Sequence, residues 1–188
     1  MKTSQLIAIS SFFTSLTFLG AQLALYVGPV PITFQTFFVI LSGLIGGARI
    51  GLVSQLLYLI LGLFGLPVFA GFRGGLTVFM GPTAGYLFSF PIASAAAGLI
   101  FHPSKNKIVL QGLLACIISE IVVYGVGVPW LIYWLSNFGG IYIFDAFSRA
   151  ILMGALIFLP GDALKIILIL YLLNRKDIQH LIIRIRAS

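Results

Sequence analysis

Long apolar segments, separated by short breaks rich in glycine, proline or basic residues, constrain the fold of this chain more than any other feature. Charged residues make up 8% of the 188 positions, whereas a soluble domain carries about 25%. A helix that crosses a bilayer needs about 20 apolar residues, so the chain has room for roughly six crossings and short loops. We therefore expect one all-α integral membrane domain and no separate soluble domain.

The predicted membrane spans follow from the positions of the breaks. They cover approximately residues 5–26, 32–47, 50–66, 83–101, 108–126 and 160–174. Residues 66–85 contain too much glycine and proline for a helix, yet they are too apolar for a loop facing water. Irregular backbone of this kind occurs beside a bilayer only where protein covers it or where it lines a cavity. This segment is therefore predicted to be an outer loop over a binding site.

Residues 144–158 form a short helix-like stretch before the last predicted span. Counting them as a full crossing would leave an odd number of spans before the basic tail. Pro160 also occupies a position favoured in the first turn of a helix. We expect a re-entrant or interfacial segment here, followed by a last span that begins at Pro160.

The net charge of +7 is distributed around the apolar segments. With six spans and an internal N-terminus, eight basic residues face the cytoplasm, and these are Lys2, Arg49, Lys105, Lys107, Arg175, Lys176, Arg184 and Arg186. Such a bias predicts cytoplasmic N- and C-termini in the plasma membrane, with the tail 175–188 at the inner surface. The same distribution argues against a nucleic-acid-binding stripe.

One carboxylate and one ammonium, Asp162 and Lys165, lie three residues apart inside the last apolar segment. That spacing places both on one helix face, and each charge costs about 2.5–3.5 kcal/mol at the centre of a span. The pair could simply neutralise itself near the start of a helix. We favour a ligand site that presents a strong acceptor beside a strong donor.

Other polar residues near the outer side are weaker candidates for ligand binding. Arg73 is followed by Gly74 and Gly75, whose backbone N–H groups could hold an anion; the alternative is an arginine at the lipid headgroups. Gln35 and Tyr86 lie at a similar depth in their segments. Glu120 lies deep in the fifth segment, where we expect a structural hydrogen-bond partner rather than a ligand.

Several kinds of chemistry find no support in the sequence. The single Cys116 excludes an internal disulfide, and no histidine or acidic cluster has metal-ligand spacing. The chain has no phosphate-binding P-loop motif and no catalytic set, so we expect neither ATP hydrolysis nor another enzymatic activity. Ser11 and Ser15 have the spacing of small residues that allows close helix packing, which serves either internal packing or docking of a partner.

Four motifs carry a resemblance to a known family. They are VPITFQT at residues 30–36, GLPVFAG at 65–71, GPTAGY at 81–86 and LPGDALK at 159–165. In this order they resemble the BioY family, the biotin-binding S components of energy-coupling factor transporters. The resemblance implies six helices around an outward-facing biotin pocket, with biotin as transported ligand and no cofactor. It also implies that Asp162 and Lys165 hold the ureido ring of biotin.

The resemblance further implies partners, namely a transmembrane T component and two ATP-binding-cassette ATPases. The helical face by which S components meet the T component corresponds to Ser11 and Ser15, where serine replaces the usual alanine. Arg73 is another departure, because the family often has small residues there. Two alternatives stay open: an S component for a different vitamin, and an autonomous proton-coupled secondary transporter that uses Glu120 or Asp162.

Overall fold

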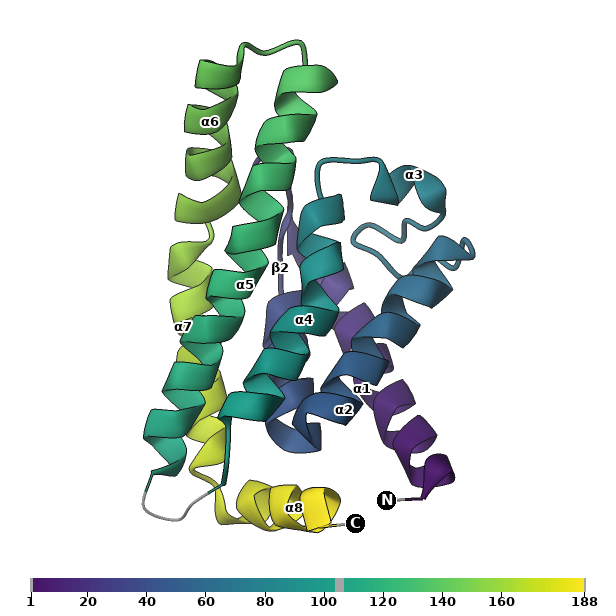
Figure 1. Ribbon diagram of the computed structural model, residues 1–188, viewed down its shortest axis with the longest axis vertical. Coiled ribbons are helices and arrows are strands. Elements are labelled where there is room, and N and C mark those ends of the chain that lie inside the picture. The colour runs from purple at the N-terminus through teal and green to yellow at the C-terminus, as the bar shows by residue number, and fades with distance from the viewer. Residues whose placement is uncertain (1, 104–106, 188) are drawn as a thin grey trace.

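The computed structural model describes residues 2–103 and 107–187 and is helical apart from one short strand pair (Figure 1). The strands are β1 (Ala24–Leu25) and β2 (Ile32–Thr33), which pair antiparallel. The helices are α1 (Thr3–Gln22), α2 (Gln35–Leu63), α3 (Leu76–Phe79), α4 (Ala84–Ile100), α5 (Ile108–Asn137), α6 (Ile143–Ile151), α7 (Leu159–Leu173) and α8 (Lys176–Ala187), with a π-helical turn η1 (Leu152–Leu156) between α6 and α7.

Helix α2 is a hairpin of two antiparallel arms, residues 35–46 and 48–63, rather than one straight rod. Gly47 between them has φ 79° and ψ 173°, a conformation that is essentially restricted to glycine. Gln35, at the start of one arm, donates from Nε2 to the Tyr58 hydroxyl near the end of the other, at 2.7 Å. The turn lies at the break predicted between the spans 32–47 and 50–66.

The α2 hairpin packs closely against α4 and α1. A Cβ added to Gly43 would lie 2.0 Å from the Ser94 carbonyl oxygen of α4, so only glycine allows this approach. Polar side chains link the same helices: the Ser42 and Ser94 hydroxyls lie 2.7 Å apart, and Gln55 Nε2 donates to Thr17 Oγ1 at 3.1 Å. These contacts are the inter-helix hydrogen bonds expected of buried polar groups in a membrane bundle.

The predicted re-entrant or interfacial segment before the last helix is wrong. Residues Ile143–Leu173 form one continuous apolar helical stretch beside α5 (Figure 1). The π turn carries the helix across this region, with an i→i+5 bond from Ile157 N to the Leu152 carbonyl at 3.1 Å. Pro160 therefore lies at the start of α7 without separating it from α6. Helix α5 continues through Pro129 to Asn137, beyond residue 126, where the fifth span was predicted to end.

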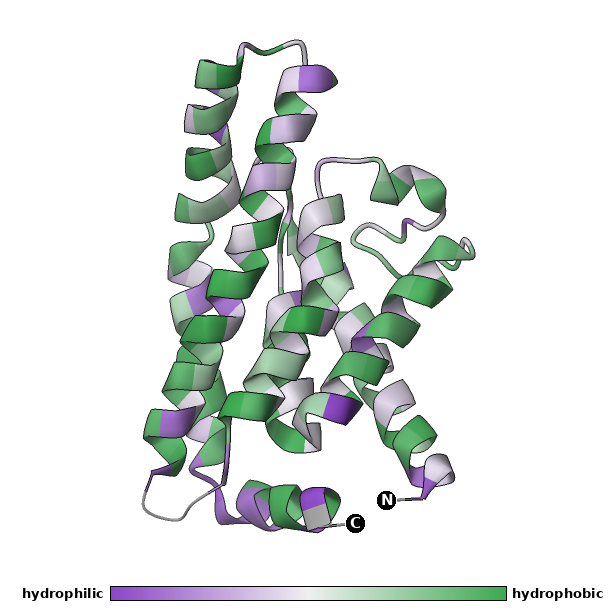
Figure 2. Cartoon of the chain, in the orientation of Figure 1, coloured by the Kyte–Doolittle hydropathy of each residue, from purple (hydrophilic) through white to green (hydrophobic). Residues whose placement is uncertain are grey.

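The outer faces of the helices are apolar. Four helical stretches in the described part of the chain are long and apolar enough to cross a membrane, and α4 is a shorter apolar helix. Figure 2 shows hydrophobic residues over most of the bundle and more hydrophilic residues along α8. In the basic tail, α8 buries Ile182 against the bundle. The protein is therefore an all-helical, multi-pass membrane protein.

Candidate ligand-binding site

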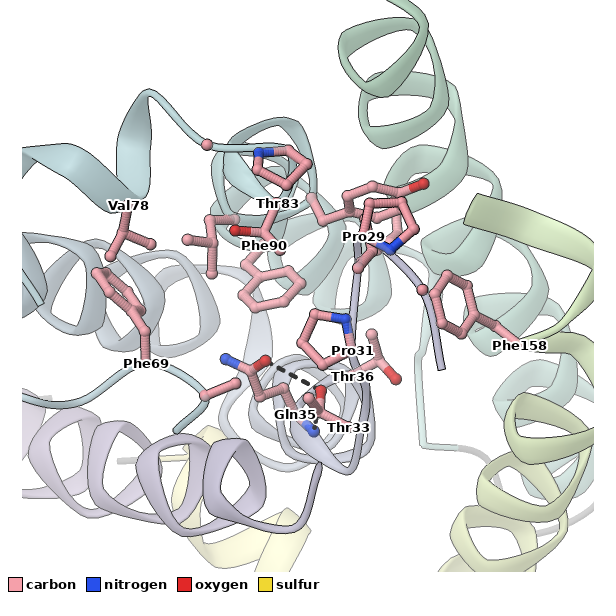
Figure 3. Close-up of a pocket in the computed structure, with 18 of the residues that line it drawn as sticks. Pro29, Pro31, Thr33, Gln35, Thr36, Phe69, Val78, Thr83, Phe90 and Phe158 are labelled. Carbon is pink, nitrogen blue, oxygen red and sulfur yellow. Dashed lines mark hydrogen bonds between the residues drawn. The ribbon is translucent and has the colours of Figure 1, made fainter. Parts of the chain in front are cut away.

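A cavity of about 400 Å³ opens between the loops near residues 26–34 and 64–83 and helices α2, α4, α5 and α7. Its volume falls within the usual range of small-molecule sites. Apolar and aromatic side chains form much of its wall (Figure 3). Its lining residues are Tyr26, Gly28, Pro29, Val30, Pro31, Thr33, Gln35, Thr36, Phe69, Ala70, Arg73, Thr77, Val78, Gly81, Pro82, Thr83, Tyr86, Leu87, Phe90, Glu120, Val123, Tyr124, Phe158, Asp162 and Lys165.

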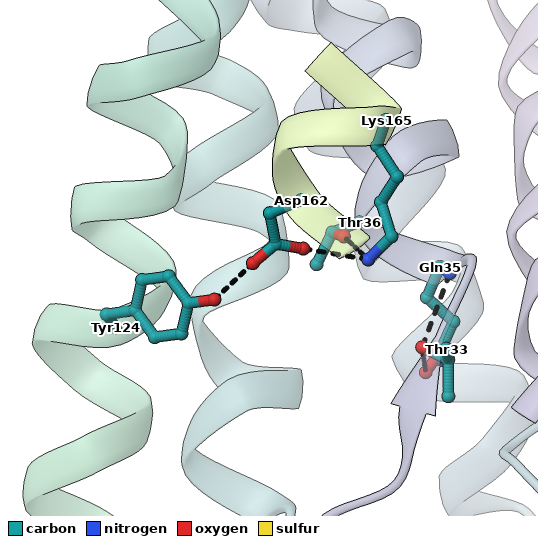
Figure 4. A network of polar contacts seen from close by, with 6 residues as sticks. All are labelled: Thr33, Gln35, Thr36, Tyr124, Asp162 and Lys165. Atoms are coloured by element: carbon teal, nitrogen blue, oxygen red, sulfur yellow. Dashed lines mark hydrogen bonds and ion pairs between the residues drawn. The ribbon is translucent and has the colours of Figure 1, made fainter. Parts of the chain in front are cut away.

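Asp162 and Lys165 form a buried ion pair in the wall of this cavity. Asp162 Oδ1 lies 2.8 Å from Lys165 Nζ, and each side chain is only 7% exposed. Lys165 Nζ also donates to Thr36 Oγ1 at 2.8 Å, and the Tyr124 hydroxyl donates to Asp162 Oδ2 (Figure 4). The four residues come from α2, α5 and α7, so the network joins three helices across the site.

This network leaves part of the hydrogen-bonding capacity of the pair unused. A lysine ammonium has three donors, and two of those of Lys165 are engaged. A carboxylate can accept about four hydrogen bonds, whereas Asp162 accepts two from side chains. The site can therefore accept an N–H from a ligand and donate to a ligand carbonyl without disrupting its internal bonds.

Gln35 lines the cavity, but both ends of its amide already have protein partners. Its Oε1 accepts from Thr33 Oγ1 at 3.0 Å, and its Nε2 donates to the Tyr58 hydroxyl. Tyr58 in turn donates at 2.8 Å to the Val68 carbonyl in the loop between α2 and α3. Gln35 therefore couples the start of α2 to the loop that covers the site.

Tyr86 also lines the cavity with its hydroxyl engaged. The hydroxyl donates to the Gly154 carbonyl of the π turn at 2.7 Å, and the ring packs edge-on against Phe158 with centroids 6.4 Å apart. A Cβ at Gly127 would lie 2.4 Å from the Tyr86 ring. The aromatic side chain thus fixes α4 against α5 and the π turn.

Arg73 lines the exposed side of the cavity, whereas Gly74 and Gly75 do not belong to the lining. The backbone holds Arg73 in place through paired bonds to Phe69, with Phe69 N donating to the Arg73 carbonyl at 2.9 Å. Its guanidinium has no ion-pair partner among residues 2–103 and 107–187. A cation without an acidic partner at the mouth of a cavity is available to a ligand anion.

Glu120 lines the cavity as well, and the structural partner predicted for it is absent. Neither carboxyl oxygen has a hydrogen-bond partner within the described chain. The adjacent Ser119 faces α4 and donates to the Ala93 carbonyl at 3.0 Å, while the hydroxyl of Tyr124 is engaged by Asp162. The prediction failed because these two neighbouring hydroxyls are directed to other acceptors.

Ser11 and Ser15 lie outside the cavity on an exposed face of α1. The Ser15 hydroxyl donates to the Ser11 carbonyl at 3.0 Å, which satisfies it within its own helix. Neither serine side chain therefore packs against another helix of this chain.

Thr36 and Tyr124, which were not predicted from the sequence, complete the network around the ion pair. A pattern for each was present. Thr36 follows Gln35 in a polar Thr-Phe-Gln-Thr run, and Tyr124 lies one helical turn after Glu120, on the same face of α5. Both side chains are common enough in membrane helices that the pattern alone did not separate them from packing residues.

Comparison with known proteins gives a consistent family assignment. The BioY family model matches residues 1–179. A probable biotin transporter BioY of Pyrococcus horikoshii is 42% identical over 85% of this chain and 88% of its own length. The biotin transporter BioY of Thermotoga maritima is 36% identical over 84% of this chain and 87% of its own.

A solved structure is similar over the whole chain. It is the S-component for biotin from an ECF-type ABC transporter, and it matches with a TM-score of 0.74 at 26% sequence identity. The match covers 100% of this chain and 95% of that one.

Proposed function

Because this chain belongs to the BioY family, we propose that it is the biotin-binding S component of an energy-coupling factor importer. The observation that carries the proposal is the buried Asp162–Lys165 pair in the wall of a cavity of small-molecule size. Two opposite charges with free hydrogen-bonding capacity, held among apolar walls, suit a mostly apolar ligand with one compact polar group.

The ureido ring of biotin has that chemistry. It presents N–H donors and a carbonyl acceptor on adjacent atoms. Asp162 accepts one N–H and Lys165 donates to the carbonyl, while Thr36 and Tyr124 hold the two charged groups in place. Aromatic walls such as Phe90 and Phe158 cover the apolar bicyclic body.

The carboxylate tail of biotin points to the exposed side of the cavity, where Arg73 is the available cation. Gly74 and Gly75 follow Arg73 in the loop, and their lack of side chains allows the loop backbone to close over the biotin tail. Gln35 and Tyr86 act mainly by fixing the wall, because their polar atoms are already hydrogen-bonded to the protein.

The chain works with partners that hydrolyse ATP, since it contains no P-loop of its own. These are a transmembrane T component and two ATP-binding-cassette ATPases, and the exposed Ser11–Ser15 face of α1 meets the T component. Six crossings carry the chain through the plasma membrane: α1, the two arms of α2, α4, α5 and the α6–α7 rod. Both termini are cytoplasmic, as the basic flanks favour.

Calorimetric titration of the purified chain in detergent with biotin tests the binding function. We expect tight one-to-one binding by the wild type and an affinity about 10- to 100-fold weaker for Asp162→Asn, because a charge-assisted hydrogen bond is lost. Asp145→Asn is the matched control, since it makes the same change at an exposed acid of α6 and leaves the affinity unchanged.

Two results would overturn parts of this proposal. If the wild type bound a different vitamin in a panel and did not bind biotin, that vitamin would be the ligand instead. Uptake of biotin by liposomes that contain this chain alone under a proton gradient would replace the S-component role with that of a secondary transporter.

A further inference from the structure

Glu120 is the one acidic side chain in the cavity wall whose chemistry the proposed contacts leave unexplained. It belongs to α5, one helical turn before Tyr124, whose hydroxyl binds Asp162. The residue is 8% exposed, and it lines the same cavity as the ion pair. It therefore lies beside the polar end of the site.

Both carboxyl oxygens of Glu120 lack a hydrogen-bond partner in the part of the chain that the structure describes. A buried polar group in a native protein nearly always has a partner, and a carboxyl group without one is especially unfavourable in a membrane interior. The neighbouring polar groups do not supply it, because Ser119 donates to the Ala93 and Ala115 carbonyls. A donor from a bound ligand in the cavity would satisfy these oxygens.

The charges of the buried wall lead to the same conclusion. Lys165 is its only cation within residues 2–103 and 107–187, and Asp162 already pairs with it at 2.8 Å. Glu120 is a second acid without a matching cation, so this part of the site has more acceptors than donors. It suits a ligand group that brings more than one N–H.

We propose that Glu120 is a specificity-determining residue that accepts the second N–H of a cyclic urea, the one that Asp162 does not take. This inference rests on the proposed biotin function, and it assigns each polar atom of the ureido ring a separate partner. Asp162 and Glu120 each accept one N–H, and Lys165 donates to the carbonyl between them. The arrangement selects a urea over rings that carry only one N–H.

Two cyclic-carbamate analogues of biotin test the assignment, because each replaces one ureido N–H by oxygen with little change in shape. Binding of biotin and both analogues is measured by calorimetry for the wild type, Glu120→Gln and Asp162→Asn. The wild type should bind each carbamate about 10- to 100-fold more weakly than biotin, since a carboxylate then faces an oxygen. Glu120→Gln should bind biotin more weakly by a similar factor.

The decisive comparison is between the two carbamates. In Glu120→Gln, one carbamate should bind about as well as biotin, because the glutamine amide can donate to the ring oxygen. The other carbamate should still bind about 10- to 100-fold more weakly than biotin in Glu120→Gln. In Asp162→Asn, that same carbamate should bind about as well as biotin. Non-additivity of this kind identifies a direct contact.

Ser119→Ala controls for disturbance of α5, because Ser119 is buried next to Glu120 but faces α4. It should leave the ranking of the three ligands unchanged. Equal biotin affinity in the wild type and Glu120→Gln would overturn the inference alone, as would an equal loss for all three ligands. Absence of biotin binding by the wild type would overturn the proposed function together with the inference.

Discussion

At the scale of single residues, the ion pair depends on two neutral neighbours. Tyr124 donates to one oxygen of Asp162, and Thr36 accepts from Lys165 at 2.8 Å. These bonds fix the rotamers of both charged side chains before a ligand arrives, so less conformational entropy is lost on binding. The two neighbours belong to α5 and α2, so the orientation of the pair depends on the packing of three helices.

Tyr124→Phe should therefore weaken biotin binding without abolishing it. The phenylalanine ring keeps the packing, but Asp162 loses one fixed bond and becomes free to turn away from the ligand. We expect the dissociation constant to rise about threefold to tenfold, within the range of one lost hydrogen bond. Tyr133→Phe, at a half-exposed position of the same helix, should leave it unchanged. Equal constants for both variants in calorimetry would contradict an orienting role for Tyr124.

At the scale of elements, the α2 hairpin depends on the backbone of one residue. Gly47 has a positive φ of 79° at the turn between two antiparallel arms, where any side chain strains the backbone. The arms carry Gln35 and Tyr58, which are bonded to each other at 2.7 Å. A change at the turn thus acts on the fold and on the wall of the cavity.

Gly47→Ala should lower the free energy of unfolding by about 1–3 kcal/mol, which is the usual strain of a side chain in this conformation. Gly125→Ala is the matched control, because Gly125 is exposed in α5 with nothing within 4 Å of an added Cβ. That substitution should be neutral or slightly stabilising, since alanine favours helix. Thermal unfolding in detergent measures both variants, and similar midpoints would rule out strain at Gly47.

The same elements show why sequence reasoning succeeded at some positions and failed at others. The break between the spans 32–47 and 50–66 and the Asp162–Lys165 pair could be predicted because glycine conformation and charge burial are local properties. The continuous α6–α7 rod could not be predicted. Pro160 is typical of the first turn of a helix, and the sequence does not show that a π turn joins this helix to the one before it. The bond from Tyr124 to Asp162 joins positions 38 residues apart and depends on helix packing.

At the scale of the whole molecule, Arg186 connects the C-terminal helix to the rest of the bundle. Its guanidinium donates to the Leu44 carbonyl at 2.9 Å and to the carbonyl of Phe101, and it lies 5.3 Å from the centre of the Phe101 ring. These carbonyls belong to the ends of the first α2 arm and of α4, where unpaired helix carbonyls favour a cation. Burial lowers the pKa of the Arg186 guanidinium below its ordinary value.

Arg186→Gln should therefore destabilise the whole bundle, because it leaves two helix ends without their cationic partner. We expect the free energy of unfolding in detergent to fall by about 2 kcal/mol, the scale of a charge-assisted hydrogen bond. The biotin affinity of the folded fraction should stay the same, since no residue of α8 lines the cavity. Arg184→Gln removes an exposed charge from the same helix and should have little effect. If both variants unfolded at the same midpoint as the wild type, α8 would be an independent tail rather than part of the bundle.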